Sequence, residues 1–336
     1  MDTTLPINSG VSIVICCYNS QNRIIPTLNA IAKQIIADFS VEIIIVNNAS
    51  TDNTSTLTQN TWNALNAPFP LSIIEEKTPG LNAARIAGIK NAQHPIILLC
   101  DDDNHLYPDY LSVLVKTFWV HPEVGAVGGQ GIPLFESQEP EWFESSKGAY
   151  AVGAQLPGSG YAWVLYGACL ALRNSACQKL LSSNFQFIGT DRKGNQLASG
   201  GDTELCLALR ILGFKLWYEE SLKFFHAIPA NRLQWSYLIR LHEGFTSAGV
   251  YHDIYQSYLS PSPPKNYILD LFKKWTYFLA ICIKYYPQYK QAKEGNPLIL
   301  NYIGWKQRVV SWPLILPSLV HKKRKFAEWY KHQTNV

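Results

Sequence analysis

Three adjacent aspartates follow an apolar run, and they are the residues of this chain best suited to chemistry. The segment at 96–104 reads IILLCDDDN, with Asp101, Asp102 and Asp103 where the run ends. Such a run is typical of a strand buried on both faces of a parallel sheet. Because side chains alternate along an extended backbone, we expect Asp101 and Asp103 on one side and Asp102 on the other. Two carboxylates on one side suit a hard divalent cation, although a solvated acidic loop that caps the next helix explains the same residues.

A second pair of acids, Asp202 and Glu204, lies in the segment GGDTEL at 200–205. It follows a polar, glycine-bearing stretch at 188–201, which we expect to be a mobile loop, and opens a predicted helix to about Leu212. Carboxylates in a first helical turn are favoured as caps against the helix dipole, so their position alone does not require catalysis. His226, which ends a predicted strand at 222–225, is a third candidate, although a lone histidine is often structural.

The elements that must position these residues alternate between strands and helices. Predicted strands cover 11–17, 41–46, 71–75, 96–100 and 124–127, and predicted helices cover 24–35, about 54–63, 81–92 and 110–119. This alternation predicts an α/β fold with a mostly parallel sheet. Residues 128–160 lack a period and are predicted to be irregular. Regular structure returns at 161–172, about 175–181, 215–218, 222–225 and about 232–248.

Polar side chains follow four of the predicted strands. They lie at Tyr18-Asn19, at Asn47–Asp52, at Asp101–Asp103 and at His226. The carboxyl ends of parallel strands meet at one edge of a sheet, where such folds bind ligands. The four clusters are therefore expected along one rim.

Composition narrows the class of protein. The 336 residues include 29 Lys and Arg against 25 Asp and Glu, with no extended basic block before residue 321, which argues against a nucleic-acid partner. Seven cysteines, an odd number without CxxC spacing, indicate reduced thiols and a cytoplasmic chain. The polar N-terminus does not resemble a signal peptide, and no stretch reaches the roughly 20 apolar residues of a spanning helix.

The C-terminal part begins after a proline-rich break, SPSPP at 260–264. We place a domain boundary at 250/251, which leaves 251–336 as a helical, aromatic and basic extension. An amphipathic helix is predicted at 266–284 and another at 315–330, with HKKRK at 321–325 beside aromatic residues. This extension would either anchor the chain at an anionic membrane face or pack on residues 1–250.

Five segments in order resemble the family-two glycosyltransferases over roughly residues 10–250. They are VSIVICCYN at 11–19, VNNASTDNT at 46–54, PGLNAARIAG at 79–88, the acids at 101–103 with Pro108, and GGDTEL at 200–205. The resemblance implies the A-type glycosyltransferase fold, in which helices flank a mostly parallel central sheet. Residues 1–250 would then form the nucleotide-sugar-binding and catalytic domain, with the helical extension after it.

The resemblance also implies donor contacts. It places the nucleotide base at Tyr18, Asn19, Asn47 and Asp52, and Arg85 near the nucleotide. Asn47 stands where the family often has aspartate, and an amide donates as well as accepts hydrogen bonds, so the nucleobase stays open. Arg85 is followed by isoleucine where the family often has asparagine, and an arginine on a helix surface is the alternative interpretation.

The remaining roles concern the metal and the reaction. The resemblance implies Asp101 on the ribose side, and Mn²⁺ or Mg²⁺ on Asp103 and His226, where the ion would stabilise the diphosphate. Asp102 borders the same site and is expected to contribute least. Asp202 is the implied base, although Gly201 replaces the first acid of the family's usual pair. The substrate-binding candidates that remain are Glu204, Arg232 and Trp235.

The sequence thus predicts an inverting, metal-dependent glycosyltransferase. It would move a sugar from a nucleotide-diphosphate donor to a glycan or lipid-linked acceptor in cell-surface or exopolysaccharide synthesis. We expect it in the cytoplasm, at the inner membrane face if the extension is an anchor. Two alternatives stay open: a binding or scaffolding protein that has lost catalysis, which Asn47 and Gly201 would suit, and a sugar-1-phosphate nucleotidyltransferase. The segment CCYNSQNR after the first strand lacks the glycine-rich, basic loop of the latter class.

Overall fold

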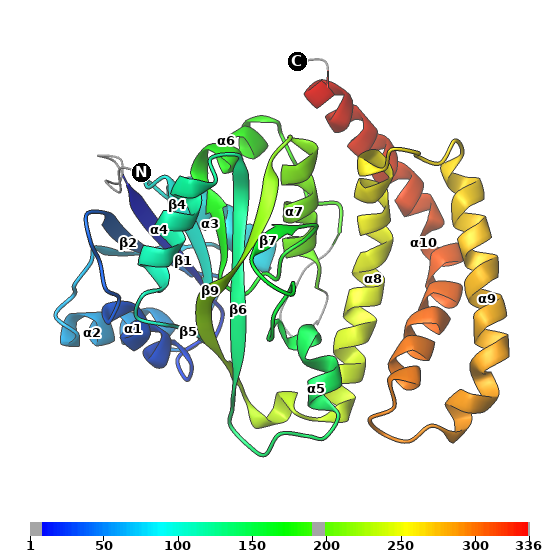
Figure 1. The fold of residues 1–336 in the computed structure, drawn as a ribbon, viewed down its shortest axis with the longest axis horizontal. Coiled ribbons are helices and arrows are strands. Elements are labelled where there is room, and N and C mark those ends of the chain that lie inside the picture. Colours follow the sequence, from blue (N-terminus) through cyan, green and yellow to red (C-terminus); the bar gives the residue numbers. More distant parts are fainter. Residues whose placement is uncertain (1–8, 190–198, 335–336) are drawn as a thin grey trace.

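A nine-stranded sheet forms the centre of the computed structural model, which describes residues 9–189 and 199–334 (Figure 1). The strand order is β3-β2-β1-β4-β8-β6-β9-β5, and β7 pairs with β9. The first four strands run parallel to one another: β1 (Gly10–Cys17), β2 (Ser40–Asn47), β3 (Leu71–Glu75) and β4 (Ile96–Asp101). Their bounds agree with the sequence prediction within one residue at each end. For β1, β2 and β4 the reason is a long apolar run that is buried on both faces of the sheet, whereas β3 at the edge is only partly buried.

Helices cover both faces of this parallel half. They are α1 (Ile24–Ala32), α2 (Thr54–Ala64), α3 (Leu81–Asn91) and α4 (Tyr110–Val120). Successive side chains of β1 point to opposite faces of the sheet and enter different core clusters. Ile13 packs in the cluster that contains residues of α1 and α4, whereas Val14 packs in the cluster that contains residues of α3. The predicted α/β architecture is confirmed.

The second half of the sheet is mostly antiparallel. Strand β8 (Leu170–Arg173) runs antiparallel to β4 and to β6 (Val124–Phe135), and β9 (Lys215–Ile228) runs parallel to β6. Two short strands, β5 (Asn104–Leu106) and β7 (Gly160–Ala162), pair antiparallel with β9. The sheet is therefore mixed, and the parallel pairing expected from the sequence holds chiefly for its N-terminal half.

The region predicted to be irregular, 128–160, contains regular structure. Strand β6 continues to Phe135, and a short helix α5 (Phe143–Ser146) leads into a 3-10 turn, η1 (Lys147–Tyr150). Glycines obscure the strand in the sequence, yet the pairing needs them: a Cβ on Gly129 would lie 2.3 Å from the carbonyl oxygen of Leu222 on β9. The two strands predicted at 215–218 and 222–225 form the single strand β9, because β6 pairs with β9 along its whole length.

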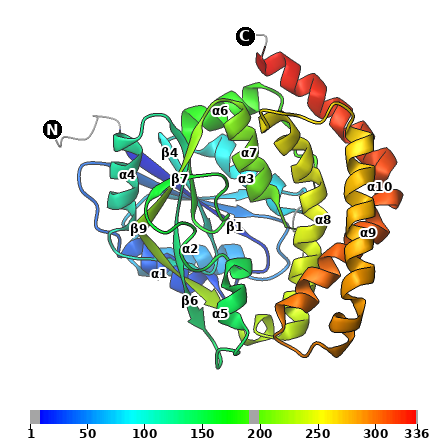
Figure 2. The same cartoon turned by 45° about the vertical axis from the view of Figure 1, so that its right-hand side comes forward.

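Three long helices follow the sheet, after α6 (Asn174–Ser182), α7 (Gly201–Ile211) and the 3-10 turn η2 (Ala230–Arg232). They are α8 (Trp235–Leu259), α9 (Tyr267–Gln291) and α10 (Pro297–Thr334). In Figures 1 and 2, α8 lies beside the sheet domain and α9 lies at the outer edge of the molecule. The predicted boundary after residue 250 falls inside α8, and Val250, Trp312 and Phe326 share one core cluster with the sheet.

The expected mobile loop at 188–201 lies largely outside the described residues. Among the helices that are described, none has the length and apolar character needed to cross a membrane.

Candidate active site

A cavity of about 810 Å³ opens at the carboxyl ends of β1 and β4. Its wall is built from the loops after these strands, from the start of α3 and of α7, from the loop between β7 and β8, and from α8. Eight of the predicted site residues line it: Tyr18, Arg85, Asp101, Asp102, Asp103, Asp202, His226 and Arg232. The fold therefore brings together residues that are up to 214 positions apart in the chain, from Tyr18 to Arg232.

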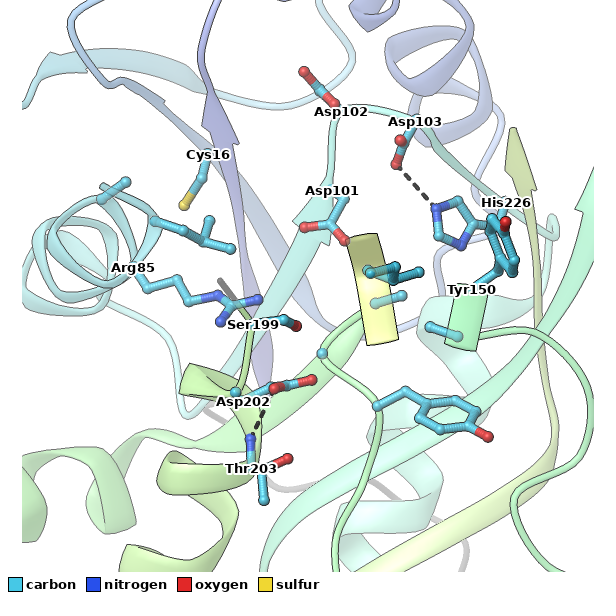
Figure 3. A pocket seen from close by; sticks show the side chains of 18 of the residues that line it. Cys16, Arg85, Asp101, Asp102, Asp103, Tyr150, Ser199, Asp202, Thr203 and His226 are labelled. Carbon is cyan, nitrogen blue, oxygen red and sulfur yellow. Dashed lines mark hydrogen bonds and ion pairs between the residues drawn. The ribbon is translucent and has the colours of Figure 1, made fainter. Parts of the chain in front are cut away.

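The three strand-end aspartates point in different directions (Figure 3). Asp102 is 8 % exposed, and its carboxylate accepts hydrogen bonds from Arg23 Nη2 at 2.7 Å, from Arg23 Nε at 3.2 Å and from the hydroxyl of Ser20. Burial raises the pKa of the Asp102 carboxyl, the adjacent Asp103 raises it further, and the contacts with Arg23 and Ser20 oppose the rise. Asp102 thus holds the strand end to α1.

Asp103 faces the opposite way, toward His226 and Arg232. Its Oδ1 lies 3.5 Å from His226 Nε2, and its Oδ2 accepts a hydrogen bond from Arg232 Nη1 at 3.2 Å. Strand pairing explains the contact with His226: β5 begins at Asn104, which lies directly opposite His226 in the antiparallel register with β9. Although burial acts to lower it, Asp103 raises the pKa of Arg232, so the guanidinium stays charged beside the carboxylate.

The donor set at this point suits a metal ion only in part. Within residues 9–189 and 199–334, no group of three or more His, Cys, Asp and Glu side chains is placed to hold an ion. Asp103 and His226 provide two donor atoms, and the buried Nδ1 of His226 has no hydrogen-bond partner. Mg²⁺ and similar ions are often held by one or two protein ligands together with substrate phosphates and water. The pair therefore suits an ion whose remaining ligands come from a bound diphosphate and water. It does not form a site in which the protein supplies every ligand.

Asp202 lies on the other side of the cavity, in the first turn of α7. Its Oδ1 accepts a hydrogen bond from the backbone nitrogen of Thr203 at 2.8 Å (Figure 3). A Cβ built on Gly167 would lie 2.8 Å from Asp202 Oδ2 and 3.0 Å from Arg85 Nη2, so these two side chains converge over Gly167. Arg85 is only 6 % exposed, which places its charge inside the wall and not on an outer helix surface.

Glu204, the second acid of α7, points away from the cavity. It is 2 % exposed, and its carboxylate accepts hydrogen bonds from the backbone nitrogens of Ile188 at 2.9 Å and Gly189 at 2.7 Å and from the hydroxyl of Tyr255 at 2.7 Å. Burial raises the pKa of Glu204, and these hydrogen bonds with the charge of Lys322 oppose the rise. Glu204 therefore links α7 to α8 and to the backbone at Ile188 and Gly189.

The predicted base-binding residues divide in two groups. Tyr18 lines the cavity and is 46 % exposed, whereas Asn19, Asn47 and Asp52 are not part of its wall. Asn47 Nδ2 donates to both carboxylate oxygens of Glu75, its partner in the β2–β3 register, at 2.9 and 3.0 Å. Asn19 accepts from the backbone nitrogen of Thr51 at 2.8 Å, and Asp52 accepts from that of Thr54 at 3.1 Å. Their predicted contacts with a nucleotide stay predictions.

Sequence reasoning missed several residues of the wall. Asn48, beside Asn47, lines the cavity and holds its rim, since its Nδ2 donates to the carbonyl oxygens of Glu76 and Thr78 and its Oδ1 accepts from Gly80 N. The cavity is also lined by aromatic and histidine side chains from η1, from the β7–β8 loop and from α8, namely Tyr150, Tyr166, Tyr237, Phe245 and His252. In the sequence, the abundance of aromatic residues in 128–166 could have pointed to Tyr150 and Tyr166.

Trp235 and Cys16 differ in whether they reach the cavity. Trp235 starts α8 and is not part of the cavity wall; it contacts the ring of Trp142, at 5.6 Å between centroids, in a hydrophobic cluster that also holds Tyr150 and Tyr237 of the wall. Cys16 lines the cavity, but burial raises the pKa of its thiol to about 12, so it is not a thiolate near neutral pH.

Known proteins resemble this chain in sequence and in fold. TarS of Staphylococcus aureus, a poly(ribitol-phosphate) beta-N-acetylglucosaminyltransferase, is 27 % identical over 138 residues, which are 39 % of this chain and 24 % of TarS. The uncharacterized glycosyltransferase YwdF of Bacillus subtilis is 36 % identical over 107 residues, 32 % of this chain and 37 % of YwdF. The mannosyltransferase PcManGT of Pyrobaculum calidifontis, solved with GDP-Man and Mn²⁺, has a TM-score of 0.52 and 16 % identity over 95 % of this chain and 74 % of its own.

The matches with TarS and YwdF cover less than two fifths of those proteins, and the likeness to PcManGT concerns the fold alone. The family model for glycosyl transferase family 2 matches residues 12–181, about half of the chain. This range holds the strand-end aspartates and Arg85 and ends before Asp202, His226 and Arg232. The chain belongs to glycosyl transferase family 2.

Proposed function

We propose that this protein is a glycosyltransferase that moves a sugar from a nucleoside diphosphate donor to a hydroxyl group of a second substrate. The observation that carries the proposal is the division of charge across one cavity: Asp103 with His226 and Arg232 lies on one side, and Asp202 lies on the other. The side with Asp103, His226 and Arg232 suits the diphosphate of the donor, because a cation held there would offset its negative charge. The carboxylate of Asp202 on the other side suits the removal of a proton from the attacking hydroxyl. Membership of family 2 supports the reaction class.

The diphosphate half would be held by Asp103, His226 and Arg232, with Asp101 toward the ribose. Asp103 and His226 would hold Mn²⁺ or Mg²⁺, and such an ion supplies positive charge beside the leaving diphosphate. Arg232 and Arg85 add fixed positive charge in a largely buried wall, where each is worth more than in water. The likeness in fold to PcManGT, which was solved with GDP-Man and Mn²⁺, supports this choice of ligands.

The reaction would be a single displacement. Asp202 takes the proton of the acceptor hydroxyl while its oxygen bonds to the anomeric carbon, and the bond from that carbon to the diphosphate breaks with its electron pair on the leaving oxygen. Attack from the face opposite the leaving group inverts the anomeric centre. The placement of Asp202 across the cavity from Asp103 and His226 supports this geometry.

For the acceptor we propose a glycan or a lipid-linked sugar in cell-surface or exopolysaccharide synthesis. The name of TarS gives poly(ribitol-phosphate) as its acceptor, which supports a polymer of this class. We also propose that the enzyme works in the cytoplasm at the inner face of a membrane.

The deciding experiment is a panel of UDP-, GDP- and dTDP-sugars, each with Mn²⁺, with Mg²⁺ or with EDTA. A ligand at a hundredfold excess over its Kd stabilises the folded state by about 2.7 kcal/mol, so a true donor should raise the Tm clearly. We expect one nucleotide class to raise the Tm only with metal, and to release its nucleoside diphosphate. No shift with any nucleotide sugar in either metal would show the proposal to be wrong, and a shift without release under all acceptors would indicate a binding protein.

A further inference from the structure

The two C-terminal helices carry much of the apolar surface that the protein exposes. Of eighteen large hydrophobic residues recorded as exposed in the described chain, nine lie on α9 and α10, which together hold about a fifth of the sequence. They are Ile268, Leu269, Phe272, Tyr277, Ile283, Tyr286, Val310, Leu314 and Val320. Scattered exposed hydrophobic residues are normal, but a concentration on one helical hairpin is a mark of an interaction surface.

Helix α9 concentrates these side chains on one face. Leu269, Phe272 and Ile283 are 51 %, 59 % and 70 % exposed, and at roughly 100° per residue they project within about 60° of one another. The other side of α9 is already used, since Tyr267 and Leu271 are buried in the core cluster shared with α8 and α10. The inner face of α9 therefore packs on the rest of the protein, whereas the apolar side chains of its outer face are exposed.

The same hairpin is strongly basic. Residues 267–334 hold twelve Lys and Arg and three Asp and Glu, whereas the rest of the chain holds seventeen and twenty-two. The two parts thus have formal net charges of +9 and −5. A modest net charge of +4 for the whole protein conceals this separation.

Exposed basic side chains lie on both helices. Lys273 and Lys284 are exposed on α9, about 40° and 60° around the helix from Leu269 at the edge of the apolar stripe, and Arg324 and Lys325 are exposed near the end of α10. In contrast, Lys322 and Lys323 of the same basic run point inward, over the rings of Tyr251 and Tyr267. The basic run is therefore divided between packing on the protein and facing solvent.

We propose that the outer face of α9, with the exposed lysines beside its apolar stripe, docks on the surface of an anionic lipid bilayer. The apolar stripe would lie among the acyl chains just below the headgroups, and the lysines beside it would face the lipid phosphates, as in helices that lie in the plane of the interface. The inference rests on the membrane location in the proposed function and names the surface responsible. In Figure 1, α9 lies at the outer edge, on the far side of α8 from the sheet, so docking there leaves the cavity clear.

Two other occupants fit the same surface less well. A second copy of this chain on a two-fold axis would place one +9 hairpin against another, and like charges oppose that contact. A nucleic acid would match the charge, but bases stack on aromatic rings, whereas Leu269, Ile283, Val310 and Leu314 are aliphatic. Acyl chains and anionic headgroups match both parts of the surface.

The test is co-sedimentation of the full chain with vesicles of phosphatidylcholine, with and without 30 % phosphatidylglycerol. We expect binding to the anionic vesicles, little binding to the neutral ones, and weaker binding in 0.5 M NaCl. The double variant Phe272→Glu with Ile283→Glu should bind at least tenfold more weakly. A matched control, Ile35→Glu with Val120→Glu, changes two side chains that are 62 % and 58 % exposed on other elements and should bind like the wild type.

Three results would overturn the inference. They are no binding of the wild type to anionic vesicles, equal loss in both double variants, or a dimer by light scattering that only the α9 variant breaks, without vesicle binding. Circular dichroism of each variant confirms that it is folded. Because the assay needs no sugar transfer, a chain that binds vesicles but no nucleotide sugar would keep this inference and refute the proposed activity, and the reverse result would do the opposite.

Discussion

Two acidic clusters face the same cavity, Asp101–Asp103 at the end of β4 and Asp202 with Glu204 at the start of α7, and in each cluster neighbouring acids have different partners. Asp103 meets His226 and Arg232, whereas its neighbour Asp102 is turned to Arg23 and Ser20. Asp202 lines the cavity, whereas Glu204, two residues on, is buried against backbone nitrogens and Tyr255.

The comparison separates two uses of a carboxylate. Asp102 and Glu204 accept several hydrogen bonds from protein groups and join elements that are far apart in sequence, although Asp102 also borders the cavity. Asp103 and Asp202 line the cavity from opposite sides. Adjacency in a motif therefore does not mean a shared role, because the backbone turns successive side chains to different neighbours.

The largest expected effect is on Asp202. Replacing it with asparagine removes the base and keeps the shape, so release of nucleoside diphosphate from the donor should fall about a thousandfold, within the range that general bases contribute. The donor-induced rise in Tm should persist, since the diphosphate half is intact. Asp109→Asn, at an exposed aspartate before α4, is the control. Unchanged turnover in Asp202→Asn would remove this residue from the mechanism.

Asp103→Ala tests the other functional acid. It removes the carboxylate between His226 and Arg232, so metal-dependent donor binding should weaken and activity should fall about a hundredfold. The measurement is the Tm shift with donor at increasing Mn²⁺. A shift that needs no more metal than the wild type would contradict the assignment of Asp103.

Asp102→Ala makes the same chemical change in the structural acid and should have the opposite profile. The buried hydroxyl of Ser20 and the half-buried guanidinium of Arg23 lose their acceptor, so the free energy of unfolding should fall by about 2 kcal/mol. Activity per folded molecule should stay within a few-fold of the wild type. Urea unfolding and turnover measured on one preparation decide it: lost activity at unchanged stability would place Asp102 among the functional acids.

The smallest effect concerns Glu204 and pH. Burial raises its pKa in the folded state above the 4.5 of a free carboxyl, so the folded protein binds this proton more tightly than the unfolded chain does. The contribution of Glu204 to stability is therefore fully present below pH 4.5 and falls as pH rises through its folded pKa. Glutamine does not titrate, so the stability of the wild type relative to Glu204→Gln should decrease from pH 4.5 to 7.5 in urea unfolding.

Lys322→Met sharpens this last test. The charge of Lys322 lowers the pKa of Glu204, so its removal should extend the decrease to higher pH. A difference between wild type and Glu204→Gln that grows with pH would mean that the hydrogen bonds from Ile188, Gly189 and Tyr255 outweigh burial.

Much of the fold follows from local patterns. The runs VSIVICC, VEIIIV and IILLC are buried on both faces, and each ends in polar residues, so parallel pairing brings those residues to one rim. The second half was harder because its strands contain glycines that only the close approach of β6 and β9 explains.

The sequence by itself determined the α/β class, the rim where the site lies and the residue types that gather there. Only the tertiary structure decided which member of each pair faces the cavity: Asn48 lines it while Asn47 pairs with Glu75 on β3, and Asp202 lines it while Glu204 meets Ile188, Gly189 and Tyr255. The physical reason is that a side chain's direction depends on partners distant in the chain. Local periodicity determines which residues are buried, and the contacts between elements determine which neighbours each buried residue packs against.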